Sequence, residues 1–372
     1  MKVAVMGAGI GGTWLSVNLV RQGHEVVLYD KPKAKLGCAC AWGTETRQFR
    51  EFMRLVGVDP EPLIVRHLRW IDFQGVHRLA TDNFCTINRP AMIRAVLKVA
   101  NLRVVTDAPD FSRVDRVIDC TGHARAFLAP SPQDLKIVTK QVIARHDGLA
   151  PDTVYLRFGR VGYWWAFPLW VGKAAKAGNQ WHIGWGELGN TDLMEQAQRE
   201  VGFSKVACDC DWHFKEPEYV RLAPPRFMEP FFGGVDPSTG ALRPAEFRPG
   251  PGTWGPPMGG SVPVWGCCEA AGAVSPVVGE GIIPGLRCAQ ILLENWDDWG
   301  AYRAAVLREF AWMDNEYRAI RHFMAGHEIR GVLTFLRCLK NGDRFGLRVG
   351  WRDLPAILKV VRAWRREARQ PL

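Results

Sequence analysis

The chain has 372 residues, of which 47% are hydrophobic and 23% charged, and its formal net charge is +10. This globular composition excludes disorder, collagen and coiled coil as the main state, and the length predicts about two domains. No apolar run reaches 18 residues, which argues against a transmembrane helix. A strand-like segment follows Met1 directly, leaving no room for a secretory signal, and the 10 Cys lack the spacing of small secreted domains. We therefore expect a cytoplasmic protein with mostly free thiols.

The predicted elements begin with a strand–turn–helix–strand unit. Residues 2–6 predict a buried strand, and a glycine-rich turn follows at residues 7–12. Residues 13–22 predict a helix that stops at Gly23, and residues 25–29 predict a second strand. This order is typical of the start of a doubly wound α/β fold with a parallel sheet.

Further strands are predicted along the middle of the chain, where they indicate a mixed or antiparallel sheet inserted into the fold. These strands lie at residues 114–119, 136–144, 153–159 and 180–186. Residues 222–263 are rich in Pro and Gly and predict long ordered loops. Residues 284–296 predict a helix with Pro near its start, and the remainder is mostly helical by pattern.

The turn at residues 7–12 has the spacing G-x-G-x-x-G of dinucleotide-binding proteins. Gly7 permits the tight turn, Gly9 lets a pyrophosphate approach the backbone, and Gly12 lets helix and strand pack closely. The helix that follows offers free N–H groups to phosphates. Asp30, after the second strand, is placed to accept hydrogen bonds from ribose hydroxyls. This context favours a dinucleotide site over a ligand-free turn, but it does not separate FAD from NAD.

Three later segments and one Arg-led segment carry motifs that occur in this order in one family. Residues 117–122 resemble a D-A-T-G strand end, and residues 163–168 (Tyr-Trp-Trp-Ala-Phe-Pro) match Y-x-W-x-F-P. Residues 269–281 resemble D-A-A-G followed by S-P and G-E-G, and Asn88-Arg89 precedes a helix-like run. On these motifs the chain resembles the geranylgeranyl reductase family of FAD-dependent oxidoreductases, up to about Trp296 and more loosely beyond.

The resemblance implies an α/β fold with three parts. A Rossmann-type FAD-binding domain of the p-hydroxybenzoate hydroxylase-like kind would comprise residues 1–135 and 255–300. An inserted mixed or antiparallel sheet at residues 136–254 would bind the substrate. Residues 301–372 would form a helical C-terminal region.

The resemblance also implies the contacts of the FAD. The acid Glu269 would bond the ribityl hydroxyls, and the turn at residues 276–281 would bring backbone N–H groups and a helix dipole to the flavin pyrimidine edge. The residues implied to bind FAD are Gly7, Gly9, Ile10, Gly12, Asp30, Lys31, Cys38, Ala39, Arg89, Asp119, Gly122, Glu269, Gly272, Pro276, Gly279, Gly281 and Ile282.

By the same resemblance, the reaction is the saturation of C=C bonds in geranylgeranyl chains of prenyl lipids. FAD reduced by a ferredoxin or NAD(P)H would give a hydride from N5 to one alkene carbon, and a cavity acid or water would protonate the other. Archaeal ether-lipid precursors are favoured over chlorophyll side chains as substrates. Trp164, Trp165 and Phe167 would wall a dry aromatic cavity, and Cys38 and Tyr163 are the candidate proton donors.

Some positions depart from the family pattern. Cys38-Ala39-Cys40 lies where the family has a Cys-led loop close to the flavin, and we favour Cys38 over Cys40; a pair of buried inert thiols is the alternative. Cys268-Glu269 replaces the usual Gly-Asp, so the acceptor is kept on a side chain one methylene longer. The G-x-G at residues 184–186 comes later than usual, which implies a longer hairpin.

Two other functions remain open. A related flavin monooxygenase or halogenase shares the early glycines and the late acidic motif, although a halogenase would have W-x-W-x-I-P where this chain has residues 163–168. A non-catalytic electron carrier would bind FAD through the same residues and reduce nothing. An NADPH-consuming reaction with oxygen would distinguish the first alternative.

The C-terminal region holds most of the positive charge. From Ala301 onward there are 15 Lys and Arg and 7 Asp and Glu, and residues 351–366 form a basic amphipathic stretch. This pattern favours a C-terminal helix that docks on the core with a solvated basic side, and peripheral contact with an anionic membrane at the inner face is the alternative hypothesis. No nucleic-acid module is present in the sequence. Cys208-Asp209-Cys210 and Cys267-Cys268 lack C-x-x-C or His spacing, so we predict no metal site.

Overall fold

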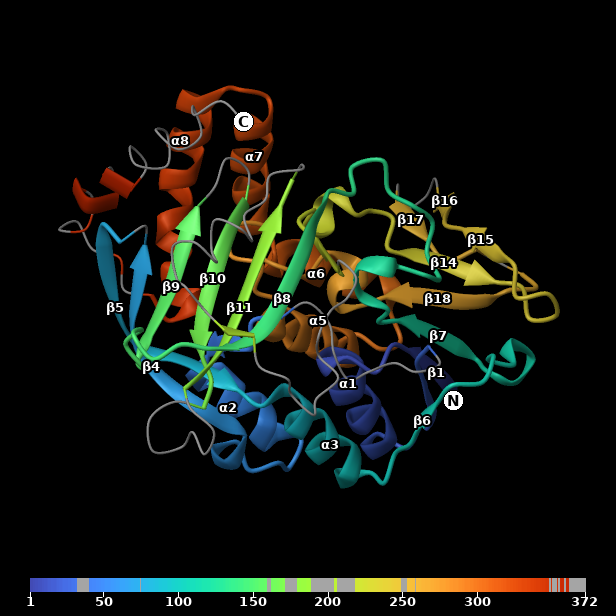
Figure 1. Ribbon diagram of the computed structural model, residues 1–372. Coiled ribbons are helices and arrows are strands. Elements are labelled where there is room, and N and C mark those ends of the chain that lie inside the picture. The colour runs from blue at the N-terminus through green and yellow to red at the C-terminus, as the bar shows by residue number, and fades with distance from the viewer. Residues whose placement is uncertain are drawn as a thin grey trace.

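Two sheets organise the molecule (Figure 1). The computed structural model describes residues 1–31, 40–73, 75–158, 162–170, 179–188, 204–205, 218–248, 253–257, 259–347, 349, 353, 355–357 and 359–360. The first sheet has the strand order β15-β14-β18-β7-β1-β2-β6. Its strands are β1 (Lys2–Met6), β2 (Glu25–Tyr29), β6 (Val104–Val105), β7 (Arg116–Asp119), β14 (Phe232–Val235), β15 (Leu242–Pro244) and β18 (Val262–Gly266).

The first sheet is mainly parallel and surrounds its central strand β1. Four of the five β1 residues are buried, as expected for a strand covered on both faces. β1 pairs in parallel with β2 and β7, and β18 pairs in parallel with β7. Helix α1 (Ile10–Arg21) packs on β1 and β2. Helices α3 (Arg89–Val99) and α5 (Ile282–Glu294) pack against α1, and all three share the hydrophobic core of this sheet.

The second sheet has the order β12-β8-β11-β10-β9-β4-β5-β3, and β13 also pairs with β8. Among the described residues, its strand pairings are antiparallel except that of β4 with β9, which is parallel. Its strands are β3 (Gly43–Glu45), β4 (Ile64–Phe73), β5 (His77–Ile87), β8 (Lys136–Arg145), β9 (Thr153–Phe158), β10 (Gly162–Pro168), β11 (Gln180–Glu187), β12 (Ser204–Lys205) and β13 (Glu218–Arg221).

The remaining elements connect and cover the sheets. The helices are α2 (Thr46–Leu55), α6 (Trp299–Glu309), α7 (Met313–Met324) and α8 (Glu328–Cys338), with short 3₁₀ turns η1 (Glu61–Leu63), η2 (Phe111–Arg113), η3 (Gly122–Ala124), η5 (Pro225–Phe227), η6 (Cys268–Ala271) and η7 (Leu339–Phe345). Strands β16 (Glu246–Arg248) and β17 (Thr253–Gly255) form a hairpin. Figure 1 shows α7 and α8 beside strands β8 to β11 of the second sheet.

The predicted strands and helices are found, with one exception. The first two strands have the predicted bounds, and α1 begins at Ile10 because Gly9 is its N-cap. The prediction that residues 222–263 are loops was wrong, because they contain β14 to β17 and the start of β18. β14 has two glycines, and a Cβ at Gly234 would lie 2.5 Å from Pro257, so a close approach explains why the strand lacks side chains there.

The sheets divide the chain differently from the predicted domain ranges. β14 and β15 lie within residues 136–254 but complete the first sheet. β3, β4 and β5 lie within residues 1–135 but belong to the second sheet. The chain therefore crosses between the sheets several times. Among the described residues, no helix combines the length and apolarity needed to cross a bilayer.

Candidate functional site

The three glycines of the turn between β1 and α1 have the geometry that each predicted role requires. Gly7 has a φ of +109°, and its N–H donates to Tyr29 O at 2.8 Å. A Cβ at Gly12 would lie 2.0 Å from Gly7 O, so helix and strand are in close contact. A Cβ at Gly9 would meet nothing within 4 Å, which leaves open space for a ligand at the backbone.

The N-terminus of α1 is open to an anion. Gly9 caps the helix without a side-chain hydrogen bond, and the first turn has no acidic residue. Ile10, the first helical residue, is buried. The free N–H groups and the dipole of this helix therefore favour a phosphate here. Asp30 lies beside the turn: its Oδ2 accepts from Ala8 N at 3.0 Å and its Oδ1 from Lys31 N at 2.8 Å.

Arg89 gives a second, independent indication of an anion-binding site. It opens α3 after the N-cap Asn88, whose Oδ1 accepts from Ala91 N at 3.1 Å. The side chain is only 4% exposed, yet its Nη1 has no hydrogen-bond partner among the described residues. A buried guanidinium without a partner is costly, so a ligand anion is the expected partner.

The middle of the site joins the ends of β7 and β18. Both oxygens of Asp119 accept hydrogen bonds from the following loop, Oδ1 from Thr121 N at 2.9 Å and Oδ2 from Phe127 N at 2.9 Å. Asp119 therefore shapes that loop. Glu269 Oε2 faces Gly122, where a Cβ would lie 3.0 Å away, and burial raises the pKa of this carboxyl. Gly272 ends the η6 turn with a φ of +89°.

Sequence reasoning missed Arg221, which fixes Glu269. This fully buried arginine bonds Asp134 at 2.7 Å and donates to the backbone oxygens of Gly122 and Glu269 at 3.1 and 2.7 Å. Its own N–H donates to Glu269 Oε1 at 2.9 Å. Arg221, at the end of β13 in the second sheet, thus links the two segments that follow β7 and β18 of the first sheet. The segment Glu218–Arg221 contains no sequence motif that would predict this role.

The corner at residues 276–281 is held against strand β10. Tyr163 Oη donates to Val278 O at 2.8 Å, and Ser275 N donates to Glu280 O at 2.9 Å. Gly279 has a φ of +64°, and a Cβ there would lie 3.0 Å from Tyr163 Oη. α5 begins directly after Gly281, so its positive end points toward this corner.

A cavity of about 360 Å³ opens beside the corner. Tyr163, Trp165 and Phe167 line it, because alternate residues of β10 point to one face of the sheet. Pro276, Gly279, Gly281 and Ile282 of the corner also line it, and almost all other lining side chains are apolar, including those from α7 and α8. The prediction that Trp164 walls the cavity was wrong. Its side chain points to the opposite face of the second sheet, where it packs with Tyr155 and Trp181.

Two carboxyl groups interrupt the apolar lining. Glu280 Oε1 accepts from Thr44 Oγ1 at 3.2 Å and from Ile282 N and Ile283 N at 3.1 and 3.0 Å. Its Oε2 has no hydrogen-bond partner among the described residues. Glu316 of α7 accepts from Ser275 Oγ at 2.7 Å. Burial raises the pKa of each to about 7, so both carry a proton part of the time at neutral pH.

Of the two candidate cysteines, only Cys40 lies within the described residues. Cys38 and Ala39 lie outside the described residues. Cys40 lines the cavity, and its N–H donates to Gln141 Oε1 at 3.1 Å. Burial raises the pKa of its thiol, and the guanidinium of Arg89 partly opposes that rise. Tyr163, the other candidate proton donor, has its hydroxyl bonded to Val278 O, and burial raises its pKa as well.

Comparisons with known proteins agree on the fold. No family model matches the chain, and no curated protein matches it. A geranylgeranyl bacteriochlorophyll reductase-like protein from Thermoplasma acidophilum superposes with a TM-score of 0.60 at 15% identity, covering 99% of this chain and 97% of that one. The lanthipeptide tryptophan 5-halogenase MibH gives 0.54 at 13% identity, covering 87% and 72%.

A third solved structure contains the cofactor. HpxO from Klebsiella pneumoniae, complexed with FAD, gives a TM-score of 0.50 at 15% identity, covering 99% of this chain and 95% of that one. Identities this low establish the architecture alone. The chain therefore shares its mixed α/β, two-sheet fold with the reductase-like protein, with the halogenase and with HpxO, which was solved with FAD bound.

Proposed function

We propose that this protein is a flavoenzyme that binds FAD and saturates C=C bonds of geranylgeranyl chains in prenyl lipids. The observation that carries the proposal is the apolar cavity, which lies where Trp165 and Phe167 meet the corner at residues 276–281. The similarity in fold to a geranylgeranyl bacteriochlorophyll reductase-like protein supports the same class.

The residues present fit FAD. The open N-terminus of α1 and the unpaired Nη1 of Arg89 would hold the pyrophosphate, and Asp30 would accept from a ribose. Glu269 would accept from the ribityl chain, and the backbone of the corner would meet the flavin ring. Bound there, reduced FAD would supply a hydride to one carbon of the alkene.

The protein's own residues would position the substrate and exclude water. An isolated alkene is a poor hydride acceptor, so close positioning in a dry site must lower the barrier. Each CH₂ group of a prenyl chain buried in the cavity contributes about 0.8 kcal/mol to binding. This lining does not suit a polar aromatic substrate, which is why we favour the reductase over a monooxygenase.

Glu280 is the proton donor that this geometry favours. It lines the cavity at the corner, its Oε2 is unpaired among the described residues, and its pKa of about 7 leaves it partly protonated. A neutral acid donates only while protonated, so alkene reduction should slow as pH rises through about 7. Loss of a general acid costs roughly 10²- to 10⁴-fold in rate, so Glu280→Gln should slow turnover by that factor and keep the flavin spectrum.

The matched control is Glu316→Gln, which removes the second cavity carboxyl. If Glu280→Gln keeps the wild-type rate and pH profile, Glu280 is not the donor. If only Glu316→Gln slows turnover, the proton donor is Glu316 of α7.

The reaction is tested directly with a prenyl lipid. The purified protein should be yellow, and after reduction with dithionite it should add two hydrogens per double bond to a geranylgeranyl ether lipid, as read by mass spectrometry. A fully saturated lipid is the control. No mass gain with any prenyl lipid rejects the reductase. Rapid NADPH consumption with oxygen and an aromatic substrate would favour the monooxygenase instead, and a flavin that reduces nothing would indicate an electron carrier.

The physiological partners that we propose are a prenyl lipid, of the archaeal ether-lipid precursor type, and a ferredoxin or NAD(P)H as electron donor. The lipid would reach the cavity from an anionic membrane surface over α8. Val332 and Phe335 of this helix line the cavity, whereas Ile329 and Leu333 are 71% and 57% exposed. The predicted basic stretch at residues 351–366 lies largely outside the described residues.

A further inference from the structure

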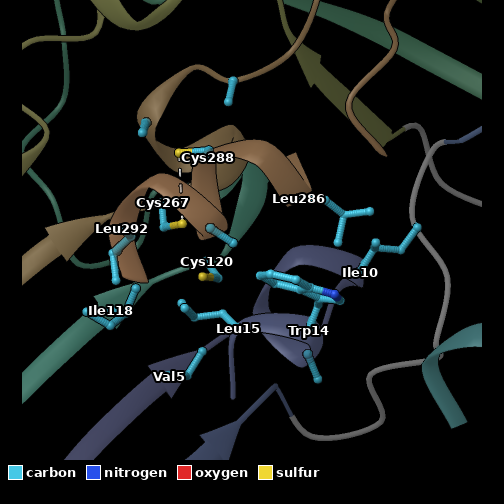
Figure 2. Packing of buried hydrophobic residues seen from close by; sticks show 14 of the residues in the cluster. Val5, Ile10, Trp14, Leu15, Ile118, Cys120, Cys267, Leu286, Cys288 and Leu292 are labelled. Atoms are coloured by element: carbon cyan, nitrogen blue, oxygen red, sulfur yellow. Dashed lines mark hydrogen bonds between the residues drawn. The ribbon is translucent and has the colours of Figure 1, made fainter. Parts of the chain in front are cut away.

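Four cysteines that the proposed reaction does not use gather behind the dinucleotide turn. The Sγ atoms of Cys120, Cys267 and Cys268 all lie within 4.8 Å of one another; Cys120 and Cys267 are buried in the core, and Cys268 is half-buried at its edge. Cys267 Sγ is 3.6 Å from Cys268 Sγ and 3.9 Å from Cys288 Sγ. Figure 2 shows Cys120, Cys267 and Cys288 turned toward one another between α1 and α5.

The fold explains why spacing along the chain did not reveal this cluster. Cys120 directly follows β7 and Cys267 directly follows β18, and these two strands are parallel neighbours. Their carboxyl ends therefore meet at one edge of the sheet. Cys268 begins η6, and Cys288 comes from α5, which packs against α1 and η6.

The backbone at Cys268 indicates that a thiol is held there at a cost. Cys268 has a φ of +57°, in the left-handed region that favours glycine. The turn also makes room for the sulfur, because a Cβ at Gly11 would lie 2.2 Å from Cys268 Sγ. Glycine would adopt this backbone conformation without strain. We therefore expect the cysteine side chain to have a function that offsets the cost.

We propose that Cys120, Cys267 and Cys268 bind a thiophilic metal ion of the zinc class. Cys288, whose Sγ lies 3.9 Å from Cys267 Sγ, would complete the tetrahedron by moving toward the other two sulfur atoms. Zn–S bonds of about 2.3 Å in a tetrahedron place sulfur atoms about 3.8 Å apart, close to the two measured separations of 3.6 and 3.9 Å. The ion would fix the turn that carries Glu269 to the end of β7 and, through Cys288, to α5.

Binding requires the loss of thiol protons. Hydrogen bonds within the cluster, followed by burial, raise the pKa values of Cys120 and Cys268, and burial raises the pKa of Cys267, so without a metal these groups are neutral thiols. Each thiol that becomes a ligand releases one proton to solvent, and no electron is transferred. The excess negative charge of the thiolates would be opposed by the Cys268 N–H, which lies 3.3 Å from Cys288 Sγ, and by the positive end of α1.

The test measures metal rather than reductase activity, so it is independent of the proposed reaction. The full-length protein is produced with Zn²⁺ in the medium, desalted and analysed for metal content. About one zinc ion per chain and a Zn K-edge absorption spectrum with a sulfur shell at about 2.3 Å are expected. The bound flavin does not interfere with either reading.

Two variants and a control decide the assignment. Cys268→Gly restores the residue that the backbone favours, so it should fold while losing at least ten-fold in zinc affinity. Cys267→Ser should lose zinc as well, and Cys85→Ala, a buried cysteine elsewhere, should keep it. Zinc-free folded protein that takes up none from added Zn²⁺, a spectrum without sulfur, or equal zinc in Cys268→Gly and wild type would overturn the proposal.

Discussion

At the scale of single residues, Arg89 makes the sharpest test of the flavin site. Its Nη1 is buried without a partner among the described residues, so a bound pyrophosphate would supply the missing acceptors. Charge-assisted hydrogen bonds of this kind are worth about 1.5–3 kcal/mol, which corresponds to roughly a 10- to 150-fold change in affinity. Arg89→Met should weaken FAD binding by that factor, as measured by quenching of flavin fluorescence.

Arg94 provides the matched control on the same helix. It lies on α3 with its side chain exposed to solvent, so Arg94→Met removes the same charge without touching the site. Equal FAD affinity in Arg89→Met and wild type would show that the pyrophosphate lies elsewhere.

The same scale shows what the sequence could predict. Glycine roles were predictable, because Gly7, Gly9 and Gly12 act through the backbone and their spacing encodes the turn. The role of Asp119 was not, because its place after a strand does not reveal that the next loop uses both of its oxygens. Glu280 was visible as part of a motif, but its acidity depends on burial that only the folded chain creates.

At the scale of elements, helix α8 connects the cavity with the surface. Ile329 and Leu333 are one turn apart and exposed, whereas Val332 and Phe335 face the cavity. If this helix meets the membrane, Ile329→Glu with Leu333→Glu should lower co-sedimentation with anionic vesicles several-fold, because each change places a charge in the interface and repels the lipid headgroups.

A change at Leu242 controls for surface hydrophobicity in general. This residue is 48% exposed on β15, in the other sheet, so Leu242→Glu should leave vesicle binding unchanged. Equal binding by the α8 variant and wild type, or binding that ignores the charge of the lipid, would remove the membrane from the proposal.

Elements differed in how well the sequence predicted them. β1 and β2 were predicted to the residue because each is a nearly continuous apolar run between turn signals, although only β1 is buried along most of its length. β14 was missed because its sequence, FGGV, has no side chains at two of four positions, and its pairing with β18 is non-local. Trp164 was placed in the wall because its neighbours were, although strand alternation sends it to the other face.

At the scale of the whole molecule, the site exists only because distant segments converge. The cavity takes residues from β10, from the corner before α5, and from α7 and α8. Charge and composition predicted a basic, helical C-terminal region but could not place α7 beside the corner. Glu316 makes that connection, since it accepts from Ser275 Oγ at 2.7 Å and from Asn341 Nδ2 at 3.4 Å.

Glu316 should therefore make the stability of the whole molecule depend on pH. The side chain is 2% exposed, and burial raises its pKa from 4.5 to about 7 in the folded chain. Between these two values the unfolded chain has lost a proton that the folded chain keeps, so the free energy of unfolding falls as pH rises from about 4.5 to about 7 and levels off above. The contribution of this group to that fall is about 3 kcal/mol.

Denaturant unfolding at pH 5 and pH 8 measures this contribution. Glu316→Gln keeps the size of the side chain and cannot ionise, and Asn341 can turn its amide to accept from the new NH₂ group. The variant should match wild type near pH 5 and exceed it by about 3 kcal/mol at pH 8. Glu294→Gln, at an exposed position on α5, should follow the wild-type curve. A Glu316→Gln curve parallel to wild type would mean that this carboxyl is ionised in the folded chain, and that α7 meets the corner through a charge.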